Sequence, residues 1–439
     1  MTQTAGYRPA ASARDHDPRR PAGAATASTG AALHGRRRDL AAVLGHWNSA
    51  VTSYYLLTGA TTMLVVLGLV MVLSSSSVES LADDRSPYAE FLKQAQFAII
   101  GLPVLWVMSR LPVAALKRLA WPMLVGAAVL QLLVFTPLGL GEGGNQNWIG
   151  VGPITMQPSE IVKLALALWI GVVLARKQAL LHDWRHAIVP VLPVGALMIG
   201  LVLLGNDLGT AMILMLLVGG GMFLAGAPLR VFAVAAVGAA AAVVALVVSS
   251  PNRVRRIFSL FSDSCDVTAE CYQTLHGQWG LATGGWWGIG LGASREKWSY
   301  LPEAHNDFIF AIIGEELGLV GTLLVLALFG ALGLAMSRII RRHPDPFVVI
   351  TTGAISVWII GQALVNIGVV IGLAPVIGVP LPLVSAGGSA LIMTMAAIGV
   401  LIAFARQEPG AAEALAARPG VVRRSLAVLG RAHGEGARR

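Results

Sequence analysis

Residues 300–318 read Tyr-Leu-Pro-Glu-Ala-His-Asn-Asp-Phe-Ile-Phe-Ala-Ile-Ile-Gly-Glu-Glu-Leu-Gly and lead into an apolar run that extends to Met336. The stretch places three ionisable residues before the run: Glu303, His305 and Asp307. It places two more carboxylates inside it: Glu315 and Glu316. An apolar run of this length is typical of a helix that spans a bilayer, which needs about 20 residues. Because ionisable groups are costly in a membrane, these acids indicate a functional site.

The composition of the whole chain indicates a membrane protein. Hydrophobic residues make up 55% of the 439 residues and charged residues only 13%, and the mean hydropathy is +0.70. A soluble protein of this size could not cover its surface with so few polar side chains. The composition therefore excludes a soluble enzyme and predicts a polytopic integral membrane protein.

Apolar runs that span a bilayer, or nearly do so, recur along the body of the chain. They lie at 55–73, 97–108, 119–138, 161–175, 188–204, 210–225, 231–248, 308–336, 347–373 and 383–404. The sequence thus predicts an all-α membrane domain over 48–406 with about ten transmembrane helices. The flanking tails, 1–47 and 407–439, are rich in Ala, Gly and Arg and are expected to be disordered.

The distribution of Lys and Arg predicts the orientation of these helices. Basic residues alternate between successive short loops, and the positive-inside rule then places both chain termini in the cytoplasm. Most of the net charge of +9 lies in the two tails. The tails either lie near anionic lipid headgroups or are simply solvated, and nothing in them predicts a nucleic-acid partner.

One long loop, 249–306, is predicted on the outer side although it is basic. Its basic residues are Arg253, Arg255, Arg256, Arg295 and Lys297. This charge favours binding of an anionic ligand, and pairing with lipid phosphates is the alternative. The only two cysteines, Cys265 and Cys271, also lie here. In an oxidising compartment they are expected to form a disulfide, the alternative being two free thiols. Two cysteines alone do not predict a metal site.

Three further motifs are predicted on the same outer side as the 300–318 stretch. Pro158 and Ser159 mark a helix start, after which Glu160 and Lys163 share a helix face and either pair or jointly hold a ligand. Asp207 begins another helix, where an N-cap role would suffice to explain it.

The third motif, 380–389, is a helix start broken by Pro and Gly that contains Ser385, Gly387 and Gly388. Such a start either binds an anion through its backbone N–H groups or is a simple bend. Because these motifs and the 300–318 stretch are predicted on one side, we expect them to form a single site.

At these motifs the chain resembles the SEDS (shape, elongation, division and sporulation) family of membrane peptidoglycan polymerases, and in particular its cell-division branch. The motifs are Gly68-Leu69-Val70-Met71, Gln157-Pro158-Ser159-Glu160 with Lys163, Asp207-Leu208-Gly209-Thr210, Glu303-Ala304-His305-Asn306-Asp307-Phe308 and Pro380 to Ser389. The chain departs from the family at Asn145-Gln146-Asn147, where the family often has an Arg pair before the Trp.

The resemblance implies polymerisation of lipid II into glycan strands at the division septum, in the plasma membrane, with a class B penicillin-binding protein as partner. It implies Asp307 as the catalytic acidic residue, which we expect to act as the base, and Glu160, Lys163 and Asp207 as activity-linked positions. His305 is expected to orient Asp307 or to help it hold a divalent cation, Mg²⁺ or Mn²⁺.

Two assignments stay open at this point. The pyrophosphate of lipid II is expected to meet Lys163, the arginines at 253–256 or the helix start at Gly387 and Gly388. Glu315 and Glu316 either bond to neighbouring helices or form a proton or ion path. The rival functions are a lipid flippase or transporter, whose ionisable groups would lie near the midplane, and a division scaffold without chemistry.

Overall fold

The computed structural model describes residues 49–82, 84–142, 145–151, 154–181, 183–248, 271–298 and 300–417. The N-terminal tail, most of the C-terminal tail and residues 249–270 of the long loop lie outside these ranges, so the disorder predicted for the tails stays a prediction. Residues 407–417, which the sequence assigned to the C-terminal tail, are described and include the short helix α14, Ala411–Ala416.

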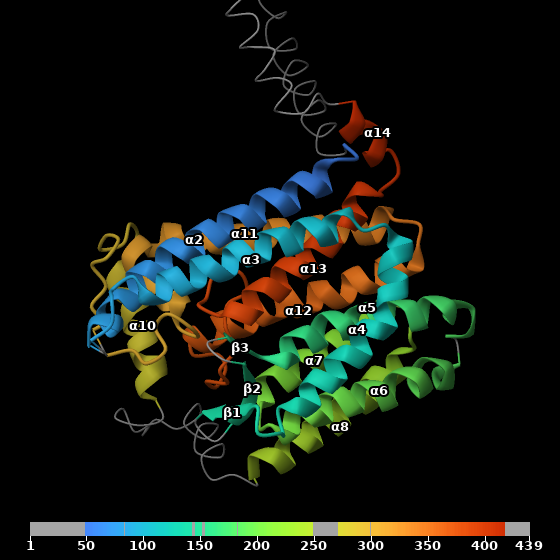
Figure 1. Cartoon of the computed structure of the whole chain (residues 1–439), viewed down its shortest axis with the longest axis horizontal. Helices are drawn as coiled ribbons and strands as arrows, with labels where there is room; N and C mark the ends of the chain where they lie inside the picture. Colours follow the sequence, from blue (N-terminus) through green and yellow to red (C-terminus); the bar gives the residue numbers. More distant parts are fainter. Residues whose placement is uncertain are drawn as a thin grey trace, which may run out of the picture. The chain divides into compact units, whose positions relative to one another are not determined.

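The described part of the chain is a bundle of helices with one small sheet (Figure 1). Seven helices are long and apolar enough to cross a membrane: α2 (Thr52–Ala82), α3 (Ala89–Arg110), α4 (Val113–Leu133), α5 (Pro158–Arg176), α11 (Ile309–Arg342), α12 (Pro346–Val370) and α13 (Gly388–Arg406). Three more contain shorter apolar segments: α6 (Trp184–Leu204), α7 (Leu208–Leu224) and α8 (Leu229–Val248). The all-α polytopic fold is therefore confirmed, with the predicted set of helices.

Local sequence signals explain where several helices begin. Pro158 occupies the first turn of α5, where its missing N–H costs nothing. The side chains of Asp183, Asp207 and Asp345 cap α6, α7 and α12 by accepting a hydrogen bond from a backbone N–H in the first turn. The N-cap role predicted for Asp207 is thus confirmed.

Burial divides the helices into enclosed and peripheral ones. In α5, 83% of the most apolar 18-residue window is buried, against 17% in α3. Figure 1 shows α12 and α13 between α2 and α3 on one side and α4, α6 and α8 on the other. The peripheral helices expose large apolar side chains such as Leu102, Trp106 and Val125. A bilayer accounts for this exposure, because lipid tails solvate such residues.

The two ends of the membrane domain meet at one end of the bundle. A Cβ placed on Gly410 would lie 3.7 Å from the Cβ of Ala50. The described segments that lead to the two tails therefore lie at the same end, which is the arrangement that an even number of spans gives. That this end is cytoplasmic stays a prediction.

The segment between α4 and α5 forms a small antiparallel sheet that the sequence did not predict. It consists of β1 (Gly139–Glu142), β2 (Asn145–Val151) and β3 (Ile154–Met156), in the order β1-β2-β3. The backbone N–H of Gln146 donates to the carbonyl of Gly205, at 3.0 Å. The sheet is thereby attached to the turn between α6 and α7.

Helix α11 is interrupted at Gly318, which has φ 68° and ψ −163°. The residues around the break bond to the segment that follows α10 (Tyr272–Gly284). The N–H of Ile289 donates to the carbonyl of Glu315 at 2.9 Å, and the N–H of Leu319 donates to that of Gly285 at 2.9 Å. The apolar pattern of the sequence continues through Gly318 and concealed this break.

Candidate active site

The end of α12 and the connection from α12 to α13, residues 371–387, hold the turn that carries Asp307. Asn366 donates its side-chain N–H to the carbonyls of Asp307, at 2.7 Å, and Val379, at 2.8 Å. The hydroxyl of Ser385 donates to the carbonyl of Asn306 at 2.7 Å. The N–H of Ala386 donates to the carbonyl of His305 at 3.0 Å. The backbone of the whole 305–307 turn is thus fixed by residues that lie 59 positions (Asn366) and 79 positions (Ser385) further along the chain.

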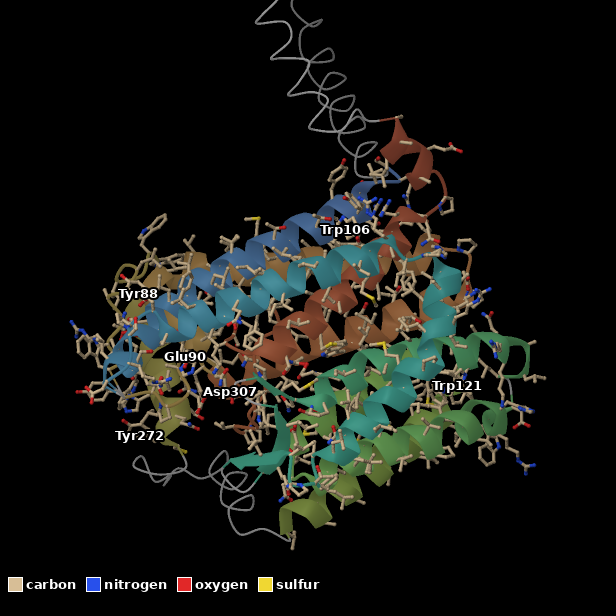
Figure 2. The ribbon with its side chains drawn as sticks, viewed as in Figure 1. Tyr88, Glu90, Trp106, Trp121, Tyr272 and Asp307 are labelled. Carbon is tan, nitrogen blue, oxygen red and sulfur yellow. The ribbon has the colours of Figure 1, made fainter. Side chains whose placement is uncertain are left out.

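Asp307 lies in the last turn before α11, outside the spanning helix, at the same end of the bundle as Glu90 (Figure 2). Burial and the nearby carboxylate of Glu303 raise the pKa of Asp307 from 3.8 to about 7, and His305 opposes the shift. A carboxyl group with a pKa near neutrality is suited to general acid–base catalysis, because it exchanges protons readily at physiological pH.

His305 contacts Glu79, at the end of α2, and not the carboxylate of Asp307. Its Nδ1 lies 3.0 Å from Glu79 Oε2. Burial disfavours the protonated ring, but Glu79, Glu303 and Glu90 outweigh it and raise the pKa of His305 above 6.5. The predicted orienting contact with Asp307 is therefore absent between these two described side chains, and His305 acts on Asp307 through its charge.

Asp207 joins the site through Gln157. The side-chain amide of Gln157 donates to Asp207 Oδ2 at 2.9 Å, while Asp207 Oδ1 accepts from the N–H of Thr210 at 2.9 Å. The backbone N–H of Gln157 donates to the hydroxyl of Ser389 at 3.2 Å. These bonds bring together the starts of α5, α7 and α13.

Glu160 and Lys163 form the predicted ion pair, at 2.8 Å, with side chains 3% and 2% exposed. Lys163 also donates to Gln362 Oε1 at 3.1 Å and lies over the ring of Trp358. Gln362 in turn donates to the carbonyl of Pro380 at 2.9 Å. The pair is thus buried and linked to the same connection as Asp307. Direct contact of Lys163 with a ligand stays a prediction.

A pocket of about 490 Å³ opens beside the Asp307 turn. It is lined by Glu90, Lys93, Gln94, Phe97, Leu140, Gly141, Trp148, Thr155, His305, Asn306, Ala386, Gly387 and Gly388. Of the predicted site residues, His305, Gly387 and Gly388 therefore line it, and Ser385 adjoins it. Asp307, Lys163 and Asp207 are not among the lining residues.

Sequence reasoning missed the contribution of α3 to this pocket. Gln94 accepts from the N–H of Gly387 at 3.2 Å and donates to the carbonyl of Ser385 at 3.0 Å. Lys93 lies 3.6 Å from Glu90, one turn away. The sequence does contain a signal for this contribution. The apolar run at 97–108 is too short to span a bilayer, so the spanning helix must include part of the polar stretch that precedes it.

Several predicted contacts fall on residues that the structure does not describe. Arg253, Arg255, Arg256 and Cys265 lie outside the described residues, so their anion-binding role and the pairing of Cys265 with Cys271 stay predictions. Within the described ranges, no group of three or more His, Cys, Asp or Glu side chains is arranged to hold a metal ion. The involvement of a divalent cation stays a prediction.

Together, these features define a polytopic membrane protein with buried polar groups and a pocket gathered at one end of its helical bundle. The model of the FtsW/RodA/SpoVE family, described as "Cell cycle protein", matches residues 55–409, and the chain belongs to this family. The resemblance inferred from the motifs is thereby confirmed.

Curated relatives include proteins named probable peptidoglycan glycosyltransferase FtsW. The one from Mycobacterium tuberculosis is 39% identical over 377 residues, which cover 85% of this chain and 72% of the relative. The one from Halorhodospira halophila is 38% identical over 364 residues, covering 82% and 91%. These names agree with the cell-division branch predicted from the motifs.

Solved structures show the same fold. A chain from a study titled "Structural coordination of polymerization and crosslinking by a peptidoglycan synthase complex" matches with a TM-score of 0.65 and 26% identity, over 80% of this chain and 96% of the other. The rod shape determining protein RodA of Thermus thermophilus matches with a TM-score of 0.61 and 26% identity, over 80% and 97%.

Proposed function

We propose that this protein is a peptidoglycan glycosyltransferase that polymerises lipid II into glycan strands during septal wall synthesis. The observation that carries the proposal is the attachment of the other three polar motifs to the fourth, residues 380–389, beside one pocket. The names of the FtsW relatives support the same activity.

The reaction needs a base at the acceptor sugar. A hydroxyl oxygen of one sugar bonds to the anomeric carbon of another, the bond from that carbon to the polyprenyl pyrophosphate breaks, and the hydroxyl proton must leave. The Asp307 carboxylate takes this proton in our proposal, because its raised pKa lets it accept a proton near neutral pH. Direct displacement inverts the anomeric centre and turns an α-linked donor into a β-linked product.

The leaving pyrophosphate needs positive charge or hydrogen-bond donors. The start of α13 at Gly387 and Gly388 lines the pocket, and the N-terminus of a helix favours anions. Lys93 provides a cation in the lining of the same pocket. Lys163 is buried with Glu160, so in our proposal it supports the α12–α13 connection and does not carry the charge of the leaving group.

The proposal extends to a partner and a location. A structural neighbour comes from a peptidoglycan synthase complex that coordinates polymerisation and crosslinking. By analogy, this membrane protein works with a class B penicillin-binding protein, which crosslinks the strands at the division septum.

The test is to incubate the purified protein and its partner transpeptidase with labelled lipid II and to look for glycan strands. Wild type is expected to make polymer, and Asp307→Asn to lose activity by at least about 100-fold. Asp183→Asn is the matched control, because Asn also caps a helix and Asp183 lies at the opposite end of α6 from the site. Polymer from Asp307→Asn at the wild-type rate would reject Asp307 as the base.

The same preparation distinguishes the flippase from the polymerase. Protein reconstituted in vesicles with fluorescent lipid II would transfer label between leaflets without forming polymer if it were a flippase. A preparation that neither polymerises nor transfers lipid II would leave the scaffold as the function.

A further inference from the structure

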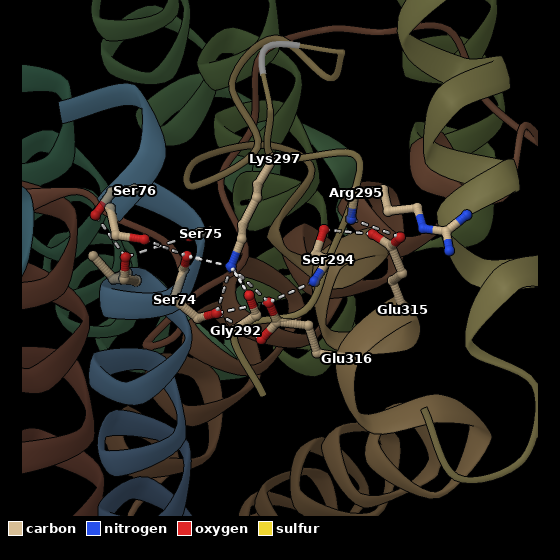
Figure 3. A network of polar contacts seen from close by, with 11 residues as sticks. Ser74, Ser75, Ser76, Gly292, Ser294, Arg295, Lys297, Glu315 and Glu316 are labelled. Carbon is tan, nitrogen blue, oxygen red and sulfur yellow. Dashed lines mark hydrogen bonds and ion pairs between the residues drawn. The ribbon is translucent and has the colours of Figure 1, made fainter. Parts of the chain in front are cut away.

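A polar network ties α2 and the loop after α10 to α11 (Figure 3). None of its labelled residues lines the pocket. The ammonium of Lys297 lies 3.3 Å from Glu316 Oε1, and the two side chains are 4% and 0% exposed. Lys297 also donates to the carbonyls of Gly292, at 2.7 Å, and Ser74, at 3.3 Å. The hydroxyl of Ser74 donates to both carboxylate oxygens of Glu316, at 2.6 and 2.7 Å.

Glu315 extends the network on the other face of α11. It accepts from the hydroxyl of Ser294 and, at 3.0 Å, from the backbone N–H of Arg295. The bonding role expected for the two glutamates is thus confirmed, although Glu315 bonds to a loop and not to a helix. Lys297, which the sequence placed among the basic residues of an outer ligand-binding loop, is buried and paired with Glu316.

The position of the network along the chain gives it a consequence for the site. Lys297 and Glu316 are 19 residues apart, and the turn with His305 and Asp307 lies between them. Their ion pair therefore closes a loop whose middle is the proposed catalytic turn. Without this closure, the two ends of the loop could separate, and the turn would be held by its contacts with Glu79, Asn366 and the α12–α13 connection alone.

Helix α2 contacts this loop at two points, through Ser74 and through Glu79. Ser74 contacts its closed base through Glu316 and Lys297. Five residues further along α2, Glu79 lies 3.0 Å from His305 in the turn itself. One rigid helix thus supports both the base and the turn of the loop.

We propose that Lys297, Glu316 and Ser74 are positioning residues that fix the loop carrying His305 and Asp307 against α2. This proposal rests on the proposed glycosyl transfer, since it assigns the network to placing the base. The three residues do not line the pocket. Their loss should therefore change the rate of the reaction more than the binding of substrate, because a displacement of about 1 Å at a reacting group costs on the order of 100-fold in rate.

The mildest test compares two serines of α2. Ser74→Ala removes the half-buried hydroxyl that reaches Glu316, whereas Ser76→Ala removes a fully buried hydroxyl that bonds to Val72 O in its own helix. We expect Ser74→Ala to lower kcat about 3- to 10-fold with KM changed less than about threefold, and Ser76→Ala to leave both unchanged. Equal behaviour of the two variants would overturn the proposal.

A second pair of variants separates positioning from stability. Lys297→Met leaves the Glu316 charge buried without its cation and is expected to lower both Tm and kcat. The double variant Lys297→Met, Glu316→Gln removes both charges and is expected to recover Tm but not kcat, because the bonds from Lys297 to Gly292 and Ser74 stay lost. Recovery of kcat together with Tm would overturn the proposal and leave the network a purely stabilising role.

Hydrogen–deuterium exchange supplies a readout that does not depend on activity. The amides of Leu301, Asn306 and Phe308 are bonded within the loop, to Glu296 or Glu303. In Ser74→Ala we expect these amides to exchange at least about 10-fold faster, with amides of α12 unchanged. Unchanged exchange at 301–308 would overturn the proposal. If wild type made no polymer, the proposed function would fail, while faster exchange in the variant would still support the positioning of the loop.

Discussion

The raised pKa of Asp307 predicts a specific pH dependence of polymerisation. The base must be deprotonated, and its pKa of about 7 means that roughly one-tenth of the molecules carry the carboxylate at pH 6 and nine-tenths at pH 8. The rate should therefore rise about 10-fold between these pH values. An ordinary aspartate, with a pKa of 3.8, would give a flat profile over the same range.

The assay is the initial rate of glycan formation at saturating lipid II, measured at several pH values in buffers of constant ionic strength. Two variants test the cause of the shift. Glu303→Gln removes a nearby negative charge and should move the rise to lower pH, whereas His305→Gln removes a nearby positive charge and should move it to higher pH. A flat profile in wild type, or a shift of either variant in the direction opposite to the one predicted for it, would refute the reasoning.

Three further predictions concern stability and packing. Asp307→Asn should raise Tm, because the fold disfavours the ionised form of Asp307. The gain in Tm should be absent below about pH 4, grow between about pH 4 and pH 7, and stay constant at higher pH. Thermal unfolding of both proteins at several pH values would measure it. Glu160→Gln should lower the free energy of unfolding by about 3–5 kcal/mol, because it leaves Lys163 charged and buried without its partner. Adding Lys163→Met to the same chain should restore the stability. Equal denaturation midpoints for the single and the double variant would contradict this prediction. Gly68→Ala should lower the rate of polymerisation by displacing the α12–α13 connection, because the added Cβ would lie 2.7 Å from the carbonyl oxygen of Val384. Gly59→Ala is the control, because no neighbouring atom lies within 4 Å of its Cβ position, and it should leave the rate unchanged.

Local signals were sufficient to predict much of the fold. Apolar runs identified the spans, Pro158 and Asp207 marked two helix starts, and the three-residue spacing of Glu160 and Lys163 predicted their ion pair. Each of these features depends on residues within about one helical turn, for which sequence spacing determines geometry.

The remaining features depend on segments that are far apart in the chain. Gln94 reaches Ser385 across a separation of 291 residues, and Ser74 reaches Glu316 across 242. No periodicity in the sequence encodes such pairs. The break at Gly318 was missed for a related reason, because it is stabilised by hydrogen bonds to the segment after α10 and not by a change in the apolar pattern.

The enclosure of α5 has a consequence for how the protein assembles in the membrane. α5 is apolar enough to insert by itself, yet in the finished fold little of its central window remains accessible to lipid. α12 and α13 pack against it and are synthesised last. The face of α5 that these two helices cover must therefore remain in contact with lipid, with Lys163 lacking Gln362, until they arrive. A ribosome-bound chain that stops before α12 would hold an unfinished bundle, and completion of the fold would coincide with completion of the site.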